Sequence, residues 1–368
     1  MNALARLTRV LEERAALESE QMVAENIRAC RKEGLLSVGV PEVFGGGGAA
    51  YPALCDMIRR LAGHCGSTGL VLAMHTHQVA ILARRAGASA QAAALLRRVA
   101  GEGLMLVSSG GTDWLDSSGT ATPTAGGYIV SARKCFASGA AMGDLLMTSA
   151  VVAGDEGDKV IHFSVPLDHP SVAVVPSWSV LGMRGTGSHD IMLRSLFVSE
   201  EEILATRRRG RWALPNHLTA LLAIPLICSA YYGVAEALFD RVVESLRAGR
   251  LTPDRIARLG ELATLAHAAR LAWVDMVATG TAEEPGFPAT NRVMMNRRLL
   301  DQHLRGLADL ALDTAGGRSF YVRNGLERLF RDLQAMRFHP MKQHDQELLA
   351  GCLALGPHYT DICAQRHD

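Results

Sequence analysis

The order of hydrophobic periodicities along the chain constrains its fold more than any other sequence feature. Residues 1–100 and the stretch from 213 onward repeat apolar residues every three or four positions, which is typical of helices. Between about 101 and 200 the chain changes to short alternating runs rich in valine, serine and threonine, separated by glycine-rich turns. Such strands favour a small barrel or sandwich. The sequence therefore predicts an α+β protein with an N-terminal helical domain (1–100), a central β-barrel domain (101–205) and a C-terminal helical bundle (206–368).

The bulk composition excludes several classes of partner and site. The net charge is +1 at pH 7 over 368 residues, so no basic field argues for nucleic acid. The seven cysteines are scattered, without a Cys-x-x-Cys pair or a Cys/His cluster, so we expect neither a disulfide framework nor a metal site. The first residues are charged and helical rather than typical of a signal peptide. We therefore expect a protein of the reducing cytoplasm.

One stretch, residues 218–239, is apolar and long enough to resemble a membrane span. It contains Pro225 in its middle and Glu236 near its end. We interpret it as a buried core helix, with a membrane span as the alternative.

The segment 316–345 carries the densest group of informative residues. A Gly-Gly-Arg turn leads into a helix that holds Arg331 and Asp332, and His339 follows seven residues after Asp332. A histidine can accept or donate a proton near neutral pH, whereas its neighbour Pro340 cannot. His339 is therefore a candidate for proton chemistry.

Three further segments have a distinctive order of residues: VPEVFGGGG (40–48), GGYIVSARKCFASG (126–139) and WSVLGMRGTGSHD (178–190). Together with 316–345, they resemble the motifs of the acyl-CoA dehydrogenase superfamily of flavoenzymes. The resemblance extends from about residue 40 to 356. It implies an acyl-CoA dehydrogenase-like fold, with an N-terminal helical domain, a central β-barrel and a C-terminal four-helix bundle, assembled as a homo-oligomer (a dimer or tetramer).

The resemblance also implies a flavin site. Val107 and Ser108 match the positions whose backbone and hydroxyl bond the pyrimidine edge of the flavin. Phe136 matches the aromatic residue that covers one face of the ring, and Ser138 matches the hydroxyl residue that bonds flavin N5. A hydroxyl suits N5 because it can both donate and accept a hydrogen bond.

The Gly-Gly-Arg turn (Gly316, Gly317 and Arg318) resembles the turn that contacts the ADP portion of FAD across a subunit interface. Glycines let the backbone approach a pyrophosphate. We therefore expect FAD, with FMN as the alternative. The family's Arg-x-x-Phe-Gly motif is absent from the corresponding stretch, where Arg247 or Arg250 could serve instead.

Two departures from the dehydrogenase pattern concern chemistry. The loop that usually reads Thr-Glu-Pro has Ser109 and Gly110 after Ser108, and the place of the usual proton-abstracting glutamate falls at about Pro340. Monooxygenases of this superfamily, such as dibenzothiophene monooxygenase, lack that glutamate and carry a histidine at the position of His339.

The leading hypothesis is thus an oxygen-activating monooxygenase that takes reduced flavin from a separate reductase and forms a C4a-hydroperoxide. Ser138 would position N5, and His339, with His75 as an assisting residue, would stabilise or protonate the peroxide. A dry pocket would protect it while oxygen passes to sulfur, nitrogen or an aromatic carbon of a small-molecule substrate. His77 is expected to be a core residue.

Two alternatives remain open. One is an acyl-CoA or acyl-carrier dehydrogenase with a relocated base, for which Glu347 is a candidate. The other is a non-catalytic flavin-binding protein, suggested by the unusual 105–118 loop and the missing Phe-Gly motif.

Overall fold

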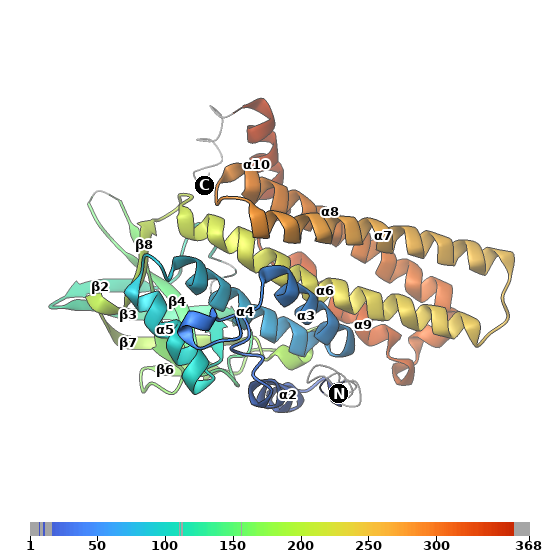
Figure 1. The fold of residues 1–368 in the computed structure, drawn as a ribbon, viewed down its shortest axis with the longest axis horizontal. Helices are drawn as coiled ribbons and strands as arrows, with labels where there is room; N and C mark the ends of the chain where they lie inside the picture. Colours follow the sequence, from blue (N-terminus) through green and yellow to red (C-terminus); the bar gives the residue numbers. More distant parts are fainter. Residues whose placement is uncertain are drawn as a thin grey trace.

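The computed structural model describes residues 7, 10, 11, 17–109, 111, 113–155 and 157–356. Helices lie at both ends of the sequence, with the strands between them (Figure 1). The N-terminal helices are α2 (Glu20–Lys32), α3 (Tyr51–His64), α4 (Gly66–Arg85) and α5 (Ala90–Glu102). The C-terminal helices are α6 (Leu214–Arg247), α7 (Pro253–Ala282), α8 (Phe287–Ala315), α9 (Leu326–Leu333) and α10 (Gln343–Leu355). The predicted succession of helices, strands and helices is confirmed.

The helix α6 is the centre of the molecule. It packs against α3 and α4 on one side and against α7, α8 and α9 on the other. The buried side chains of all these helices form one continuous core, so the two helical parts of the sequence fold as a unit. Close approach depends on Gly233, where a Cβ would lie 2.0 Å from the carbonyl oxygen of Arg59 on α3.

A proline inside α6 is accommodated by a neighbouring helix. Pro225 has no N–H to donate to the carbonyl of Leu221. The hydroxyl of Tyr51 on α3 donates to that carbonyl instead, at 3.2 Å, and also lies 2.9 Å from the carbonyl of Leu222. The helix is apolar and long enough to cross a membrane, but 94% of its most apolar window is buried inside the protein. The interpretation as a buried core helix is confirmed.

The strands form one mixed sheet of eight strands in the described part of the chain, in the order β6-β7-β3-β2-β4-β5-β8, with β1 beside β4. Their bounds are β1 (Leu106–Ser108), β2 (Thr120–Thr124), β3 (Gly127–Ala137), β4 (Leu145–Val152), β5 (Lys159–Pro166), β6 (Val172–Val175), β7 (His189–Ser199) and β8 (Ile203–Arg208). The expected closed barrel is not found, because the terminal strands β6 and β8 do not pair among the described residues.

The sheet consists of two halves that meet at a single residue pair. In the strand ladder, β2 pairs with β4 only at Thr120 and Val151, and β1 pairs with the other end of β4. Irregular pairing between β3 and β7 adds a local bend. The sheet therefore departs from the predicted barrel at two places, the short ladder between β2 and β4 and the outer strands β6 and β8, which do not pair with each other in the described chain.

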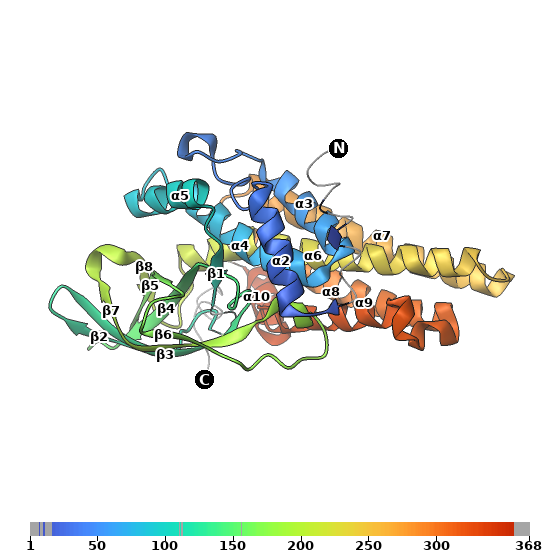
Figure 2. The same cartoon turned by 90° about the horizontal axis from the view of Figure 1, so that it is seen from below.

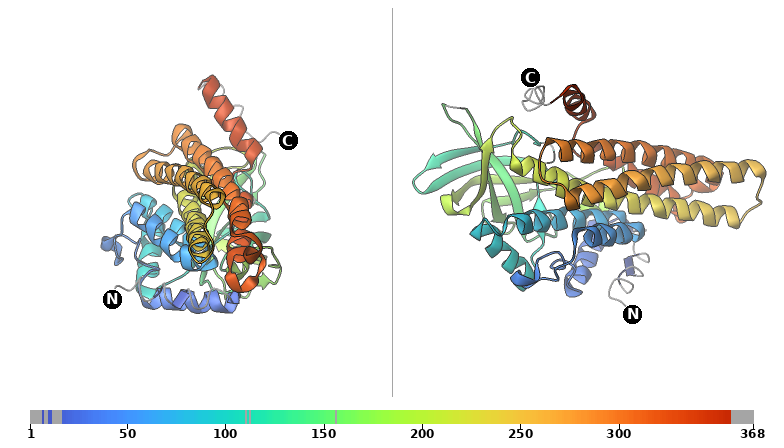
Figure 3. Two further views of the ribbon diagram at one scale, coloured as in Figure 1. Left: turned by 90° about the vertical axis from the view of Figure 1, so that its right-hand side faces the viewer. Right: turned by 45° about the horizontal axis from the view of Figure 1, so that its top comes forward.

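The sheet and the free end of the helical bundle lie at opposite ends of the molecule. Figure 2 shows the sheet at one end, beside α4 and α5, and the long helices extending away from it. The right-hand view of Figure 3 shows the same separation. The predicted domain boundaries at 100/101 and 205/206 fall inside α5 and β8, respectively, and remain predictions.

Candidate active site

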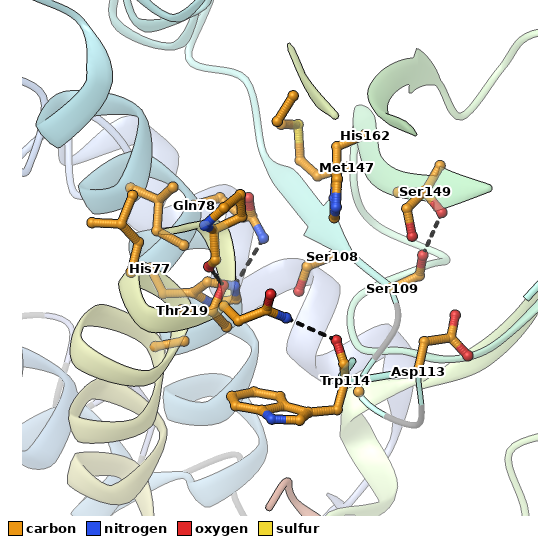
Figure 4. A pocket seen from close by; sticks show the side chains of 18 of the residues that line it. His77, Gln78, Ser108, Ser109, Asp113, Trp114, Met147, Ser149, His162 and Thr219 are labelled. Carbon is orange, nitrogen blue, oxygen red and sulfur yellow. Dashed lines mark hydrogen bonds between the residues drawn. The ribbon is translucent and has the colours of Figure 1, made fainter. Parts of the chain in front are cut away.

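A cavity of about 200 Å³ lies where the sheet meets the helices. Its walls come from α4, from the first half of α6, from β4, β5 and β8, and from the segment that holds His339 and Pro340. Figure 4 shows His77, Gln78 and Thr219 on the helix side, facing Ser108, Met147 and His162 on the strand side. The cavity thus collects side chains from segments that are far apart in the sequence.

His339 lies at the helical end of this cavity, and its ring is fixed by a buried tyrosine. The hydroxyl of Tyr231, on α6, lies 2.7 Å from Nε2 of His339. Burial raises the pKa of Tyr231, so its hydroxyl stays protonated. Among the described residues this hydroxyl has no other acceptor within reach, so it donates its hydrogen to Nε2 of His339. Burial, assisted by the nearby charge of Arg297, lowers the pKa of His339 to about 3. His339 is therefore neutral, with its proton on Nδ1.

The backbone of the His339 segment is held by the same arginine. The guanidinium of Arg297, on α8, donates to the carbonyl oxygens of Met336 (3.2 Å) and His339 (2.6 Å). Among the described residues, no protein acceptor is found for Nδ1 of His339. This nitrogen is therefore a hydrogen-bond donor for whatever occupies the cavity.

The two histidines of α4 have different surroundings. His75 lies in the core, where Nε2 donates to the carbonyl of Leu36 (2.7 Å) and Nδ1 accepts from the N–H of Leu106 (3.0 Å). Both of its nitrogens are occupied by backbone, and it does not line the cavity. His77 lines the cavity instead, with Nδ1 bonded to the carbonyl of Ala73 and Nε2 to Gln78. Burial lowers the pKa of each imidazole to about 4.

The loop between β1 and β2 borders the cavity and is held by two buried cations. Lys134, fully buried on β3, donates to Asp113 (3.1 Å) and to the carbonyl of Ser118 (2.8 Å). Arg207, on β8, donates to the backbone carbonyls of Trp114 and Asp116. The unusual 105–118 loop is therefore anchored by specific polar contacts in its described part.

The predicted flavin residues on β3 lie outside the cavity lining. Phe136 is 50% exposed, has a backbone φ of 62° and packs edge-on against Trp178 at 6.1 Å. A half-exposed aromatic residue held in a left-handed backbone conformation is costly without a ligand or partner to cover it. Val107 is fully buried in the core of the sheet, whereas Ser108 lines the cavity.

Ser138 is held in a chain of hydroxyl groups whose direction can be worked out. The hydroxyl of Thr186 donates to the carbonyl of Met183 (2.8 Å), so it must accept from Ser188 (2.8 Å). Ser188 must then accept from Ser138 (2.8 Å). The oxygen of Ser138 is left with free lone pairs only. Such an acceptor suits N5 of a reduced flavin, which carries a hydrogen, so the residues present fit the group.

The Arg331-Asp332 pair has a structural role. Asp332 accepts a bond from the N–H of Met183, and Arg331 pairs with Glu327 one turn earlier and with Glu18. Gly182 lies against this helix, because a Cβ there would be 2.1 Å from the carbonyl of Arg331. The segment with the Gly-Met-Arg-Gly-Thr sequence thus connects the sheet to α9, through Gly182 and Met183.

The Gly-Gly-Arg turn is remote from the cavity within one protomer. Gly316, Gly317 and Arg318 are exposed and follow the C-terminal end of α8. Nearby, the backbone carbonyl of Asn324 accepts a hydrogen bond from Arg241 of α6. The first residues of α6 line the cavity, and Arg241 lies about 40 Å along the helix from its first residue, at 1.5 Å per residue. The exposed candidates Arg247 and Arg250 also lie beyond that point.

Sequence reasoning missed several lining residues. Ser149, His162 and Arg207 line the cavity from neighbouring strands. Sequence reasoning also missed Tyr231, which does not line the cavity but bonds to His339 from the most apolar helix. The sequence signal that could have found the strand residues is the presence of polar residues at alternate positions of buried strands. This signal identifies a site only once the strand register is known, because the register decides which of these residues are neighbours.

Comparisons with known proteins identify the family of this chain. Residues 4–102 match the model of the acyl-CoA dehydrogenase N-terminal domain, and residues 226–344 match that of the C-terminal domain. The chain is 30% identical over 352 residues to isobutylamine N-hydroxylase of Streptomyces viridifaciens, covering 91% of this chain and 90% of that protein. It is 29% identical over 227 residues to dibenzothiophene monooxygenase of Rhodococcus qingshengii, covering 59% and 54% of the two chains.

The fold is also similar to that of a solved flavin enzyme. The dibenzothiophene monooxygenase TdsC from Paenibacillus sp. A11-2, solved with FMN and indole, superposes with a TM-score of 0.82 at 19% identity, covering 96% of each chain. The chain therefore belongs to the acyl-CoA dehydrogenase family of flavin-dependent oxidoreductases.

Proposed function

We propose that this chain is an oxygen-activating flavin monooxygenase acting on a small molecule. The observation that carries the proposal is the neutral imidazole of His339 in the cavity, in the region where a dehydrogenase would need a carboxylate base. The carboxylates that line the described cavity are Asp113 and Asp116, and both are engaged by cations, Lys134 and Arg209. The alternative base, Glu347, is exposed on α10 and does not line the cavity.

The residues that would hold the flavin come from the sheet. Ser108 and the backbone of Val107 would hold the pyrimidine edge, Phe136 would cover one face of the ring, and Ser138 would accept a hydrogen bond from reduced N5. When bound and reduced, the flavin would supply the electrons that activate dioxygen for transfer of one oxygen atom. The hydroxyl chain behind Ser138 supports this assignment, because it fixes the serine as an acceptor.

His339 would act as a hydrogen-bond donor rather than as an acid. Its pKa of about 3 keeps the ring neutral at physiological pH, so no imidazolium proton is available. Nδ1 would donate to oxygen held in the cavity, while Tyr231 holds the other nitrogen. We assign no chemical role to His75, because both of its nitrogens bond to backbone.

The apolar part of the lining supports the exclusion of water. Ile224 and Ile227 on α6 and Met74 on α4 surround the His339 end. Water exclusion would favour oxygen transfer over loss of hydrogen peroxide. Oxygen would pass to nitrogen, sulfur or an aromatic carbon, in keeping with the N-hydroxylase and dibenzothiophene monooxygenase relatives.

The remaining parts of the proposal concern partners. A separate reductase would supply reduced flavin in the cytoplasm. The protein would form a dimer or tetramer in which the exposed Gly316–Arg318 turn of one protomer completes the flavin site of its partner. Phe320 and Val322, 90% and 76% exposed beside that turn, support a protein contact there. If the turn binds the ADP portion, FAD should bind more tightly than FMN, and equilibrium dialysis would compare them.

The function is tested by mixing the protein, loaded with reduced flavin, with oxygenated buffer in a stopped-flow instrument. A monooxygenase should delay the return of oxidised-flavin absorbance relative to free reduced flavin. A dehydrogenase instead should lose its flavin colour when an acyl thioester is added without oxygen. Colour loss with thioester and no delay with oxygen would overturn the proposal, and failure to bind any flavin would favour the non-catalytic alternative.

A further inference from the structure

The strand wall of the cavity is polar where a buried sheet face is expected to be apolar. Strand register explains which side chains share this face: Ser149 on β4 pairs with His162 on β5, and His162 pairs with Ala205 on β8. Alternation then places Arg207 on the same face, two residues beyond Ala205. All four residues line the cavity. A helix-covered sheet face with this composition needs a physical reason.

A cation behind His162 fixes the direction of its hydrogen bonds. Nε of Arg207 donates to Nε2 of His162 at 3.2 Å, so the neutral ring carries its proton on Nδ1. Burial, together with the charges of Arg207, Lys134 and Arg85, lowers the pKa of His162 to about 3. Figure 4 shows the ring extending from its strand into the cavity. Among the described residues, Nδ1 has no acceptor.

A second cation lies behind Ser149. Lys134 Nζ, which can only donate, lies 3.3 Å from the hydroxyl of Ser117, so Ser117 accepts from the lysine and keeps its own hydrogen to donate. The hydroxyls of Ser117 and Ser149 lie 2.9 Å apart, and either can be the donor. When Ser117 donates to Ser149, the hydroxyl hydrogen of Ser149 is available to a ligand in the cavity. In that arrangement His162 and Ser149 both present donors from adjacent strands.

The charges around these donors are not balanced. Arg85 and Arg207 both line the cavity, and within the described chain neither forms an ion pair with a carboxylate. Arg207 is buried among carbonyl oxygens, and this burial lowers its pKa to about 10. The nearby carboxylates of Asp113 and Asp116 already have cationic partners. The charges of Asp116 and Asp113 act on Arg207 from nearby, but each carboxylate is shared with another cation, so the charge of Arg207 is offset only in part. A buried positive charge without its own ion pair favours an anion in the adjoining space.

We propose that this end of the cavity is a subsite for an oxyanion, such as a carboxylate, sulfonate or phosphate group, bound by Nδ1–H of His162 and the hydroxyl of Ser149 in the field of Arg207. The inference rests on the proposed function, because it places the anionic part of the substrate at the strand end and its reacting atom near His339. The same chemistry would also accept the phosphate of FMN, so the source of the anion must be tested.

Benzoate and its neutral isostere benzamide are suitable probes, because an apolar cavity of about 150 Å³ can hold benzene. Calorimetric titration of the flavin-free protein should give a benzoate affinity at least about tenfold above that of benzamide. Ser149→Ala and His162→Phe should each lower the affinity for benzoate about fivefold, which corresponds to the loss of one hydrogen bond. The affinity for benzamide should not change. The matched control is Ser164→Ala, because Ser164 lies on β5, as His162 does, but does not line the cavity. Equal affinities for the two probes would refute the subsite.

Competition then identifies the source of the anion. If neither riboflavin nor FMN displaces benzoate, the subsite belongs to the substrate. If FMN displaces benzoate and riboflavin does not, the oxyanion is the flavin phosphate. Displacement by both would mean that these donors serve the flavin ring, which overturns the proposal. The titration needs no turnover, so it tests the subsite separately from the proposed function. If the protein binds benzoate selectively but does not delay flavin reoxidation, the subsite is supported and the proposed function is wrong.

Discussion

The hydrogen bond from Tyr231 to His339 gives the sharpest prediction. Tyr231→Phe keeps the ring that packs against the imidazole at 5.3 Å but removes the hydroxyl that donates to Nε2. The free nitrogen is buried, so the folded state should lose about 1–2 kcal/mol. The imidazole also loses the bond that favours the Nδ1–H form. A hydrogen bond of about 1 kcal/mol corresponds to a change of about fivefold in the ratio of the Nδ1–H and Nε2–H tautomers of His339.

The functional consequence is loss of control over activated oxygen. We expect hydrogen peroxide to be released up to about fivefold faster when the variant, loaded with reduced flavin, meets oxygen. Flavin affinity should stay within about twofold of wild type, because the hydroxyl is assigned no flavin contact. Peroxide is measured by a coupled peroxidase assay, and stability by chemical denaturation. His339→Ala should show the same increase more strongly.

The neighbouring tyrosine provides a matched control. Tyr232 is also buried, but its ring stacks on Trp273 at 5.1 Å, whereas the hydrogen bond to His339 comes from Tyr231. Tyr232→Phe should therefore leave peroxide release unchanged. If Tyr231→Phe and Tyr232→Phe release peroxide at the wild-type rate, or both accelerate it equally, the assigned role of the Tyr231–His339 pair is wrong.

Three further predictions concern other parts of the molecule. Ser138→Ala should alter the flavin absorbance spectrum and lower the affinity for reduced flavin more than that for oxidised flavin, because an acceptor for N5–H is lost. An equal loss of affinity for both forms in a titration would contradict this prediction. Gly182→Ala should cost about 2–3 kcal/mol in denaturation experiments, because the new Cβ would lie 2.1 Å from the carbonyl of Arg331; unchanged stability would show that the contact relaxes freely. Finally, the buried His75 and His77 stay neutral when folded, with pKa values of about 4 instead of 6.5, whereas the unfolded chain binds protons below about pH 6.5. The unfolding free energy should be flat above that pH and should fall as pH drops toward 4, and a denaturation series with no such fall would refute this reasoning.

The comparison of His75 with His77 shows what limits a reading of the sequence. Both histidines belong to the apolar helix α4, and we expected His75 to assist His339 and His77 to be a core residue. The structure places them the other way round, with His75 in the core and His77 lining the cavity. Positions two apart on a helix point about 200° from each other, so one faces the core and the other faces the cavity. Only the packing of α4 against β1 decides which is which, and it assigned His77 to the cavity.

The same limit applies to the strand wall. Ser149 and His162 are 13 residues apart in the sequence, and Arg207 follows His162 by 45 residues. Each of them alone looks like an ordinary polar residue in a strand. Their register across β4, β5 and β8 brings them together, and Arg207 behind His162 fixes the direction of the hydrogen bond between them. No local pattern carries that information.

The sequence by itself determined the order of elements, the family and the candidacy of His339, because periodicity and motif order are local properties that survive without coordinates. It also identified the missing glutamate at about Pro340. The tertiary structure alone decided that the sheet stays open, that the helical parts share one core, and which polar groups face the cavity as donors. Those features depend on contacts between distant segments, and such contacts are set by packing and register rather than by any one segment of the chain.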